Sequence, residues 1–252
     1  MEPLLELKEI TKIFQRQKNN NFTAVDNISF CLYEGETLGI VGESGSGKST
    51  TAKIIARLVD SSSGQIFLNG QDITNLKGQK LRKIYRDIQM VFQSATGSFD
   101  PRQTLGEGIG EGLRNIGLSK KDVKQQVNLL LEQCGLSAEF ADRYPHEVSG
   151  GQCQRAAIAR ALAVKPKILI CDEATSALDV TVQEQIIALL KKLQKETGIS
   201  YLFICHDIAL VQMFCDRVIV MNEGKIVEEG TPDEVVMNPK CDYTKQLIEA
   251  VL

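Results

Sequence analysis

A glycine-rich run near the N-terminus constrains this chain more than any other feature, and its residues are Gly42-Glu43-Ser44-Gly45-Ser46-Gly47-Lys48-Ser49. The run fits the pattern G-x-x-x-x-G-K-[S/T] at every fixed position, which is typical of a phosphate-binding loop. An apolar stretch at residues 37–41 precedes it and predicts a buried strand, while residues 50–59 carry apolar side chains suited to a buried helix face. Strand, glycine turn and helix is the context that the motif requires. A phosphate site is therefore favoured over the alternative, a flexible Gly/Ser surface loop.

The residue types of this run explain how it would hold phosphate. Glycine lets the backbone fold closely around an anion, and the exposed N–H groups at a helix start attract negative oxygens. Lys48 is expected to reach the β- and γ-phosphates of a nucleoside triphosphate, and the Ser49 hydroxyl is expected to bind Mg²⁺. The predicted nucleotide ligands in this region are Gly42, Glu43, Ser44, Gly45, Ser46, Gly47, Lys48, Ser49 and Thr50.

Composition is that of an ordinary soluble globular protein. The chain has 252 residues, of which 43% are apolar and 24% charged, so it can bury a substantial core. Its net charge of −3 does not suggest nucleic acid as a partner. The N-terminus is acidic and lacks the features of a signal peptide, and no run approaches the roughly 20 apolar residues that span a bilayer. We therefore expect a cytosolic protein whose role at a membrane would come through a partner.

The cysteines are odd in number, seven in all, and form no C-x-x-C pair. In a reducing compartment we expect them to be small buried hydrophobic side chains, with metal binding as the alternative. They are Cys31, Cys134, Cys153, Cys171, Cys205, Cys215 and Cys241.

Hydrophobic periodicity predicts an opening third that is rich in β-strands around one helix. Partial alternation begins a strand region at residues 5–10, and residues 28–32 alternate cleanly, as a half-buried strand should. The polar residues 15–21 between them are expected to form a turn or loop. Residues 64–73 indicate a pair of strands joined by a tight hairpin turn at Asn69-Gly70.

The rest of the chain is helical in its middle and then alternates strands with helices. Residues 88–92 indicate a short apolar strand, and the pattern from residue 105 to residue 164 is helical. The elements expected beyond it are strands at 168–171 and 201–205, a helix at 182–197, a hairpin at 218–227 and helical structure at 232–252. This alternation implies an α/β fold with a mostly parallel sheet.

Polar residues follow the ends of three predicted strands: Gln93, then Asp172 with Glu173, and then His206. In open α/β sheets this edge is where ligands bind. Asp172 is suited to assist Mg²⁺, which prefers oxygen ligands. Glu173 would point away from Asp172 if the strand continued, and it could then poise a water for attack on the γ-phosphate. The alternative for the two acids is a simple cap on a strand or helix.

His206 and Gln93 are each open to two interpretations. The imidazole of His206 either hydrogen-bonds the γ-phosphate and holds the attacking water, or it is a polar cap after a buried strand. The amide of Gln93 either reaches Mg²⁺ or the water, or it only ends its strand.

A second helix start that suits an anion occurs at residues 148–152. Ser149 is a good N-cap, and the paired glycines Gly150 and Gly151 permit close approach of an anion. Taken alone, the segment is an ordinary helix start with flexible glycines. A second such helix start in the same chain as a phosphate loop limits the number of nucleotide-binding families that the sequence can resemble.

With these motifs the sequence resembles an ATP-binding cassette (ABC) protein over essentially its whole length. Residues 42–49 resemble the Walker A loop, residues 148–152 the LSGGQ signature with Val in place of Leu, and residues 168–173 Walker B with its catalytic glutamate. Gln93 matches the Q-loop glutamine, residues 176–179 the D-loop and His206 the switch histidine. Phe14 stands where the family places an adenine-stacking aromatic, with a core strand residue as the alternative.

The resemblance extends the list of expected site residues. It implies that ATP and Mg²⁺ are the ligands and that Glu173, His206 and Gln93 are catalytic. It also implies that the metal lies among Ser49, Gln93 and Asp172. The further nucleotide contacts that it implies are Phe14, Ser149, Gly150, Gly151, Gln152 and Asp179.

The resemblance also implies a fold and its division. The fold would be an α/β P-loop NTPase (RecA-like) core with a mostly parallel sheet, an antiparallel β subdomain and an inserted α-helical subdomain. Residues 1–252 would be a single nucleotide-binding domain. Residues 1–93 and 165–252 would form the core with the β subdomain, and residues 94–164 the helical signature subdomain.

Finer features resemble the ATPases of peptide and nickel importers, which implies import of oligopeptides, dipeptides, nickel or metal chelates. These features are residues 35–39, 98–102, 144–147 and 242–245. Two departures stand out. Cys153 occupies a place where relatives usually carry Arg, which removes a cation beside the signature and leaves Arg155 nearby. The sequence stops at Leu252 without the cysteine-rich tail of many peptide-importer ATPases. This difference slightly favours a resemblance to the shorter members, which transport metals.

The family geometry implies a mechanism and partners. Two cassettes pack head to tail, and each ATP lies between the Walker A loop of one and the signature of the other. Closure neutralises the charge of ATP from both sides, and hydrolysis reopens the pair. The expected partners are transmembrane permease subunits, a second ATPase subunit, identical or not, and indirectly an extracytoplasmic solute-binding protein, but no nucleic acid. The protein would lie peripherally on the cytoplasmic face of the membrane.

Two other functions compete with import. A soluble ABC-type ATPase acting on DNA or ribosomes would usually carry a long coiled-coil insertion or two cassettes, and the sequence contains neither. A non-catalytic ATP-binding module would be expected to have a degraded Walker B motif or switch histidine, and both are intact.

Overall fold

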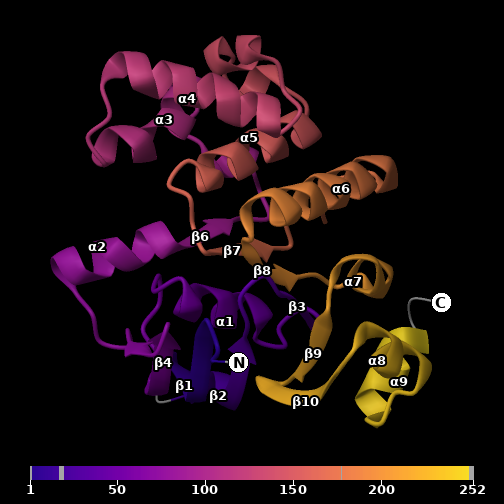
Figure 1. Ribbon diagram of the computed structural model, residues 1–252. Helices are drawn as coiled ribbons and strands as arrows, with labels where there is room; N and C mark the ends of the chain where they lie inside the picture. The colour runs from indigo at the N-terminus through magenta and orange to yellow at the C-terminus, as the bar shows by residue number, and fades with distance from the viewer. Residues whose placement is uncertain (1, 17–19, 177, 250–252) are drawn as a thin grey trace.

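The computed structural model describes residues 2–16, 20–176 and 178–249, which form two sheets with helices around them (Figure 1). The larger sheet has the strand order β10-β9-β3-β8-β7-β6. Its neighbouring strands run parallel, except that β10 pairs antiparallel with β9 as the predicted hairpin. The mostly parallel sheet is thereby confirmed. Its strands are β3 Thr37–Val41, β6 Ile88–Val91, β7 Ile168–Asp172, β8 Ser200–Ile204, β9 Arg217–Asn222 and β10 Lys225–Gly230.

The smaller sheet is antiparallel and has the order β2-β1-β4-β5. The predicted turn at Asn69-Gly70 joins β4 to β5, and both residues have positive φ values, 49° and 72°, as a tight hairpin turn requires. The prediction of a loop over residues 15–21 was too wide, because β1 and β2 pair along most of that stretch. Residues 17–19 lie outside the described residues. The strands are β1 Leu5–Arg16, β2 Asn20–Leu32, β4 Ser63–Leu68 and β5 Gln71–Asp72.

Helices α3, α4 and α5 gather at one end of the molecule, away from the smaller sheet, and correspond to the predicted helical insertion (Figure 1). In the described ranges the longer helices are α1 Lys48–Ile55, α2 Gly78–Asp87, α3 Leu105–Asn115, α4 Lys120–Gln133, α5 Gly150–Leu162 and α6 Val180–Thr197. The shorter ones are α7 Ile208–Phe214, α8 Pro232–Met237 and α9 Asp242–Glu249, with 3₁₀ turns η1 Thr96–Ser98, η2 Ala138–Asp142 and η3 Pro145–Glu147.

Three helical predictions need correction. The opening third contains a second helix, α2, which is mostly polar and buries only Ile84. Helix α1 ends at Ile55 rather than near residue 59, because Arg57 adopts a φ of 57°, which a right-handed helix cannot include. The C-terminal helical region is interrupted between α8 and α9, where Pro239 cannot donate a backbone hydrogen bond.

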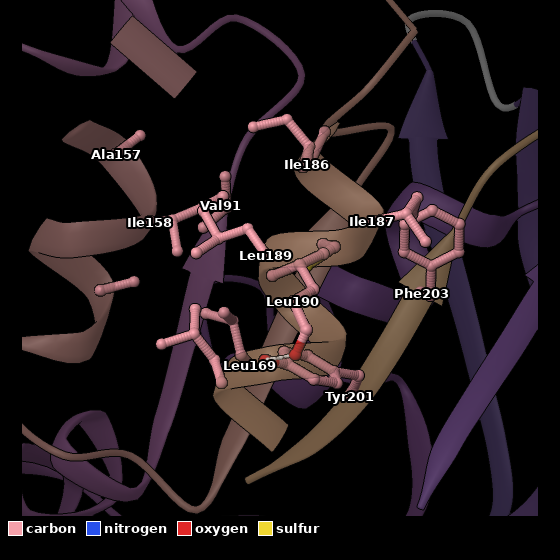
Figure 2. Packing of buried hydrophobic residues seen from close by; sticks show 14 of the residues in the cluster. Val91, Ala157, Ile158, Leu169, Ile186, Ile187, Leu189, Leu190, Tyr201 and Phe203 are labelled. Carbon is pink, nitrogen blue, oxygen red and sulfur yellow. Dashed lines mark hydrogen bonds between the residues drawn. The ribbon is translucent and has the colours of Figure 1, made fainter. Parts of the chain in front are cut away.

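The larger sheet separates two hydrophobic cores, since successive side chains of a strand point to opposite faces. In β8, Tyr201 and Phe203 join the core under α5 and α6, whereas Leu202 and Ile204 join the core shared with α1 and the smaller sheet. Figure 2 shows the apolar side of α6 packed against β7 and β8. The Tyr201 hydroxyl donates a hydrogen bond of 3.0 Å to the Leu190 carbonyl and is thus satisfied inside this core. With both faces covered, the central strands β3, β7 and β8 are buried along their whole length, and Asp172 lies at the end of β7.

The cysteines behave largely as small apolar side chains. Five are buried, namely Cys134, Cys153, Cys171, Cys205 and Cys215, while Cys31 and Cys241 are half-buried. Burial raises the pKa of the Cys171 and Cys205 thiols to about 12. Among the residues that the structure describes, no group of three or more His, Cys, Asp or Glu side chains is arranged to hold a metal ion.

Within those described ranges, we find no helix whose length and apolarity suit a bilayer crossing.

Candidate functional site

The turn between β3 and α1 holds the phosphate loop, residues 42–49, in a conformation that requires glycine at two positions. Gly42 has a φ of 146°, and a Cβ there would lie 2.1 Å from the Met221 carbonyl oxygen. Gly47 has a φ of 104°, and a Cβ there would lie 2.5 Å from the Ala24 carbonyl oxygen. Close packing of β9 and β2 against the loop therefore excludes any side chain at these positions.

The ammonium of Lys48 lies folded back on the same loop. It donates hydrogen bonds of 2.7 Å to the carbonyl oxygens of Gly42 and Glu43 and one of 3.3 Å to the Ser46 hydroxyl. The side chain is buried, and this burial lowers the pKa of Lys48 while nearby Glu173 acts against the shift. Among the described residues, no ion pair includes this lysine. A buried cation held only by neutral oxygens suits an anionic ligand.

A hydroxyl and a carboxylate meet beside the loop. The Ser49 hydroxyl, in the first turn of α1, donates a hydrogen bond of 2.8 Å to Oδ1 of Asp172 at the end of β7. Burial raises the pKa of Asp172, and the neighbouring Glu173 carboxylate adds to this, while the bond from Ser49 lowers it. Mg²⁺ binds oxygen ligands and keeps several of its waters, so this pair of oxygen donors fits that ion.

Glu173 reaches the loop by a route that the sequence pattern did not predict. Strand β7 ends at Asp172, and Glu173 adopts a left-handed φ of 49° while its N–H donates to the Ile204 carbonyl at 2.9 Å. The strand does not continue, so the turn and not strand alternation directs this side chain. A pocket of about 180 Å³ results, lined by Phe22, Ala24, Ser44, Gly45, Gly47, Lys48, Ser49, Thr50 and Glu173.

The second anion-suited helix start is a well-formed N-terminus of α5. The Ser149 hydroxyl accepts a hydrogen bond from the Gln152 N–H at 3.3 Å, and Gln152 Oε1 accepts one from the Ser149 N–H at 2.9 Å. Ser149 and Gly150 are exposed, whereas a Cβ on Gly151 would lie 2.6 Å from Val182 of α6. These residues do not line the phosphate-loop pocket, so the α5 start and the phosphate loop are two separate surfaces of one chain.

Known proteins resemble the chain over its whole length. The family described as ABC transporter matches residues 25–176. The chain belongs to the ABC transporter family. Over 257 residues it is 52% identical to the glutathione import ATP-binding protein GsiA of Salmonella paratyphi A, a match that covers 99% of this chain but only 41% of that protein. Over 253 residues it is 47% identical to the oligopeptide transport ATP-binding protein OppF of Bacillus subtilis, covering 99% of this chain and 83% of that one.

A solved ABC cassette has the same fold. The dimeric ATP-binding cassette MJ0796, in a post-hydrolysis state with ADP and Pi, superposes with a TM-score of 0.83 at 34% identity and covers 90% of this chain and 98% of its own. The predicted α/β P-loop fold with antiparallel and helical parts is thereby confirmed. The predicted boundaries at residues 93 and 165 stay a prediction.

Two other ABC motif residues, Gln93 and Asp179, make hydrogen bonds within the chain in this structure. Gln93 Nε2 donates to the Ser176 hydroxyl at 3.3 Å, and its side chain lines a separate pocket of about 90 Å³ with Gly150. Asp179 caps helix α6 by accepting from the Val182 N–H at 3.0 Å. Ala177, in the predicted D-loop, lies outside the described residues. A metal or nucleotide contact by Gln93 or Asp179 therefore remains a prediction.

His206 lies two residues beyond the end of β8 and is exposed. Among the described residues, no hydrogen bond ties its imidazole to the phosphate loop. Its role as the switch histidine stays a prediction.

Two aromatic side chains, one of them unexpected, are paired across the β1–β2 hairpin. Phe14 of β1 and Phe22 of β2 are cross-strand partners, with 39% and 40% of their surfaces exposed. Phe14 is therefore no core residue, which removes that alternative, but only Phe22 lines the phosphate-loop pocket. The predicted site residues do not include Phe22, because it directly follows residues 15–21, where a loop is expected from the sequence. The pairing of two aromatics across one hairpin could have revealed it.

Arg155 does not take the place of the arginine that the family resemblance leads us to expect at position 153. Cys153 is fully buried, and Arg155 donates to the Cys134 carbonyl at 3.0 Å and to Gln185 Oε1 at 3.1 Å. These bonds tie Arg155 to the end of α4 and to α6.

Replacing Lys48 by Ala should weaken binding of MgATP about 10- to 100-fold, because a hydrogen bond to a charged group contributes about 1.5–3 kcal/mol. Titration of the purified chain with MgATP would measure the effect. Lys191→Ala, on the exposed side of α6, is the matched control and should bind as the unchanged protein does. Equal affinity of the Lys48 variant would exclude this lysine as a phosphate ligand.

Proposed function

We propose that this chain is the ATP-hydrolysing subunit of an importer for peptides, glutathione among them. The observation that carries the proposal is the arrangement around one pocket: the Lys48 ammonium, the hydrogen-bonded pair of Ser49 and Asp172, and the Glu173 side chain. These are a cation for phosphate, oxygen donors for a divalent metal and a carboxylate for a water.

Each side chain has a distinct part in this reaction. Lys48 would exchange its loop carbonyls for phosphate oxygens and so neutralise their charge. Ser49 and Asp172 would hold Mg²⁺, which when bound orients the β- and γ-phosphates. Glu173 would accept the proton of the water that attacks the γ-phosphate. Gln93 and His206 would join the site only after a local rearrangement.

A second cassette would complete the site. The phosphate-loop pocket of about 180 Å³ is smaller than the roughly 300–1,000 Å³ that enclose a ligand of nucleotide size. The exposed start of α5, with Ser149 and Gly150, is a surface suited to cover phosphate from a neighbouring chain. The dimeric state of the MJ0796 structure supports this arrangement. The mate could be a second copy or a sister subunit.

A permease would be the membrane partner, and the chain would lie peripherally on the cytoplasmic face. A groove of about 650 Å³ lies between α2 and the helical group, with Tyr85, Gln89, Glu111 and Arg160 among its lining residues. Its lining residue Gln89 comes shortly before Gln93 in the sequence. The segment after Gln93 would transmit conformational changes of the cassette to the permease. An extracytoplasmic solute-binding protein would take part only through that permease.

The substrate class follows from the relatives GsiA and OppF, which are named for glutathione and oligopeptide transport. Nickel has no support from them, so the metal-type alternative is not carried forward.

Deleting the gene for this chain should abolish uptake of labelled glutathione or tripeptide, and supplying the chain should restore it. Supplying the Lys48→Ala variant should not restore uptake, which ties transport to nucleotide binding. Labelled nickel, tested in the same cells, should enter at an unchanged rate. Unchanged peptide and glutathione uptake after deletion, or purification of the chain with ribosomes or DNA instead of a permease, would reject the proposal.

A further inference from the structure

A contact between the C-terminal helix and the phosphate loop has no part in the function proposed above. Tyr243, in the first turn of α9, accepts a hydrogen bond of 2.9 Å at its hydroxyl from the backbone N–H of Glu43. The two residues are 200 positions apart in the sequence. The C-terminal helix therefore touches the second residue of the phosphate loop directly.

The peptide groups on either side of Glu43 are held by two different partners. Its N–H donates to Tyr243, and its carbonyl accepts from the Lys48 ammonium at 2.7 Å. If Lys48 turns towards phosphate, the carbonyl loses its partner and the bond to Tyr243 remains. The first half of the loop would then be held at this residue by α9.

Apart from the Tyr243 contact, helix α9 is held in place by the core. Glu228 of β10 is buried, and its two carboxylate oxygens accept from the backbone N–H groups of Lys240 and Cys241 at 2.9 and 3.1 Å. Leu247 and Ile248 are buried in the core under α6 and α7. In Figure 1, α9 lies beside α8 and β10 at one end of the molecule. The helix that carries Tyr243 is therefore held by contacts that do not involve the nucleotide site.

The state of the Tyr243 hydroxyl favours a lasting contact. The ring is half-buried, and burial raises the pKa of Tyr243 above its usual value, although the hydrogen bond from the Glu43 N–H acts in the opposite direction. The hydroxyl therefore stays protonated at neutral pH and remains a neutral acceptor for the Glu43 N–H.

We propose that Tyr243 is a positioning residue for nucleotide binding: its hydroxyl holds the Glu43 peptide, so that the phosphate loop keeps the conformation seen here when Lys48 leaves the loop carbonyls. The inference rests on the proposed binding of ATP. It predicts an effect on the capture of ATP and little effect on the chemical step, because Tyr243 touches neither a phosphate nor the attacking water.

The test is Tyr243→Phe, which removes only the hydroxyl, in the full chain together with its partner cassette. A lost hydrogen bond of ordinary strength should raise the Kd and KM for MgATP about 3- to 10-fold and change kcat by less than about twofold. The backbone amide of Glu43 should exchange with deuterium faster than in the unchanged protein. Tyr33→Phe is the matched control, since Tyr33 lies half-buried in the turn before β3 and its ring packs against Arg217.

The outcomes separate this inference from the function on which it rests. An unchanged protein that binds no MgATP contradicts both. A protein that binds MgATP, with equal Kd and equal Glu43 exchange in the Tyr243→Phe variant, overturns the inference alone. A variant with reduced kcat and unchanged KM also overturns it, because positioning of the empty loop acts on binding. A thermal melt of each variant shows that the comparison is between folded proteins.

Discussion

Glu173→Gln should slow ATP hydrolysis by about 10²- to 10⁴-fold while MgATP still binds, because a general base typically contributes that factor to the rate. The amide has the size and shape of the carboxylate but cannot accept the proton of the attacking water. The Glu173 side chain lines the same pocket as Lys48 and Ser49, and the left-handed turn at φ 49° aims it there. Phosphate release by the chain with its partner cassette measures the rate, and titration with MgATP measures binding.

The matched control is Glu184→Gln, which makes the same chemical change on the exposed side of α6. It should hydrolyse ATP at the unchanged rate. Near-normal turnover in the Glu173 variant would remove this residue from the reaction. Loss of MgATP binding in that variant would instead give Glu173 a role in holding the nucleotide or the site.

Mixed dimers should regain hydrolysis when one chain carries Lys48→Ala and the other Ser149→Asp, although each variant alone is inactive. In a two-fold dimer each site takes its phosphate loop from one chain and its α5 start from the other. In the mixed dimer, one site therefore contains both the Lys48→Ala and the Ser149→Asp change, and the other site contains neither. The physical basis is the separation of the two surfaces, since the α5 start does not line the phosphate-loop pocket of its own chain.

The substitution at Ser149 is chosen to keep the helix intact. Asp is as good an N-cap as Ser, so the capping bond to Gln152 survives while a negative charge repels phosphate. Ser149→Asn is the neutral control and should retain most of the activity. Differently tagged chains allow the mixed dimer to be purified and its phosphate release measured. Absence of rescue would mean that Ser149 acts within its own chain or not at all.

Much of the site was predictable because its parts are local. The phosphate loop, the strand before it and the helix after it follow one another within twenty residues, and each has its own pattern of glycine or apolar side chains. The positions of Asp172 and His206 near strand ends follow from the alternation of strands and helices. The capping box of Ser149 and Gln152 is likewise readable over four residues.

Other parts depend on distant segments and could not be predicted. The turn that directs the Glu173 side chain towards the phosphate loop depends on the backbone hydrogen bond between Glu173 and Ile204. The position of Phe22 beside the phosphate loop depends on the long β1–β2 hairpin. Helix α2 was missed because most of its residues are polar and it buries only Ile84, so it offers few apolar side chains to a pattern search. The partner of Gln93, the hydroxyl of Ser176, is 83 residues away.

The sequence by itself determined which chemical groups this protein has for a nucleotide and in which order they occur, because glycine turns, helix starts and buried strands are patterns within a few residues. Only the tertiary structure decided why Gly42 tolerates no side chain, where Glu173 points and that Tyr243 reaches the phosphate loop. The reason is physical: each of these depends on atoms that the packing of β9, β8 or α9 brings from far along the chain.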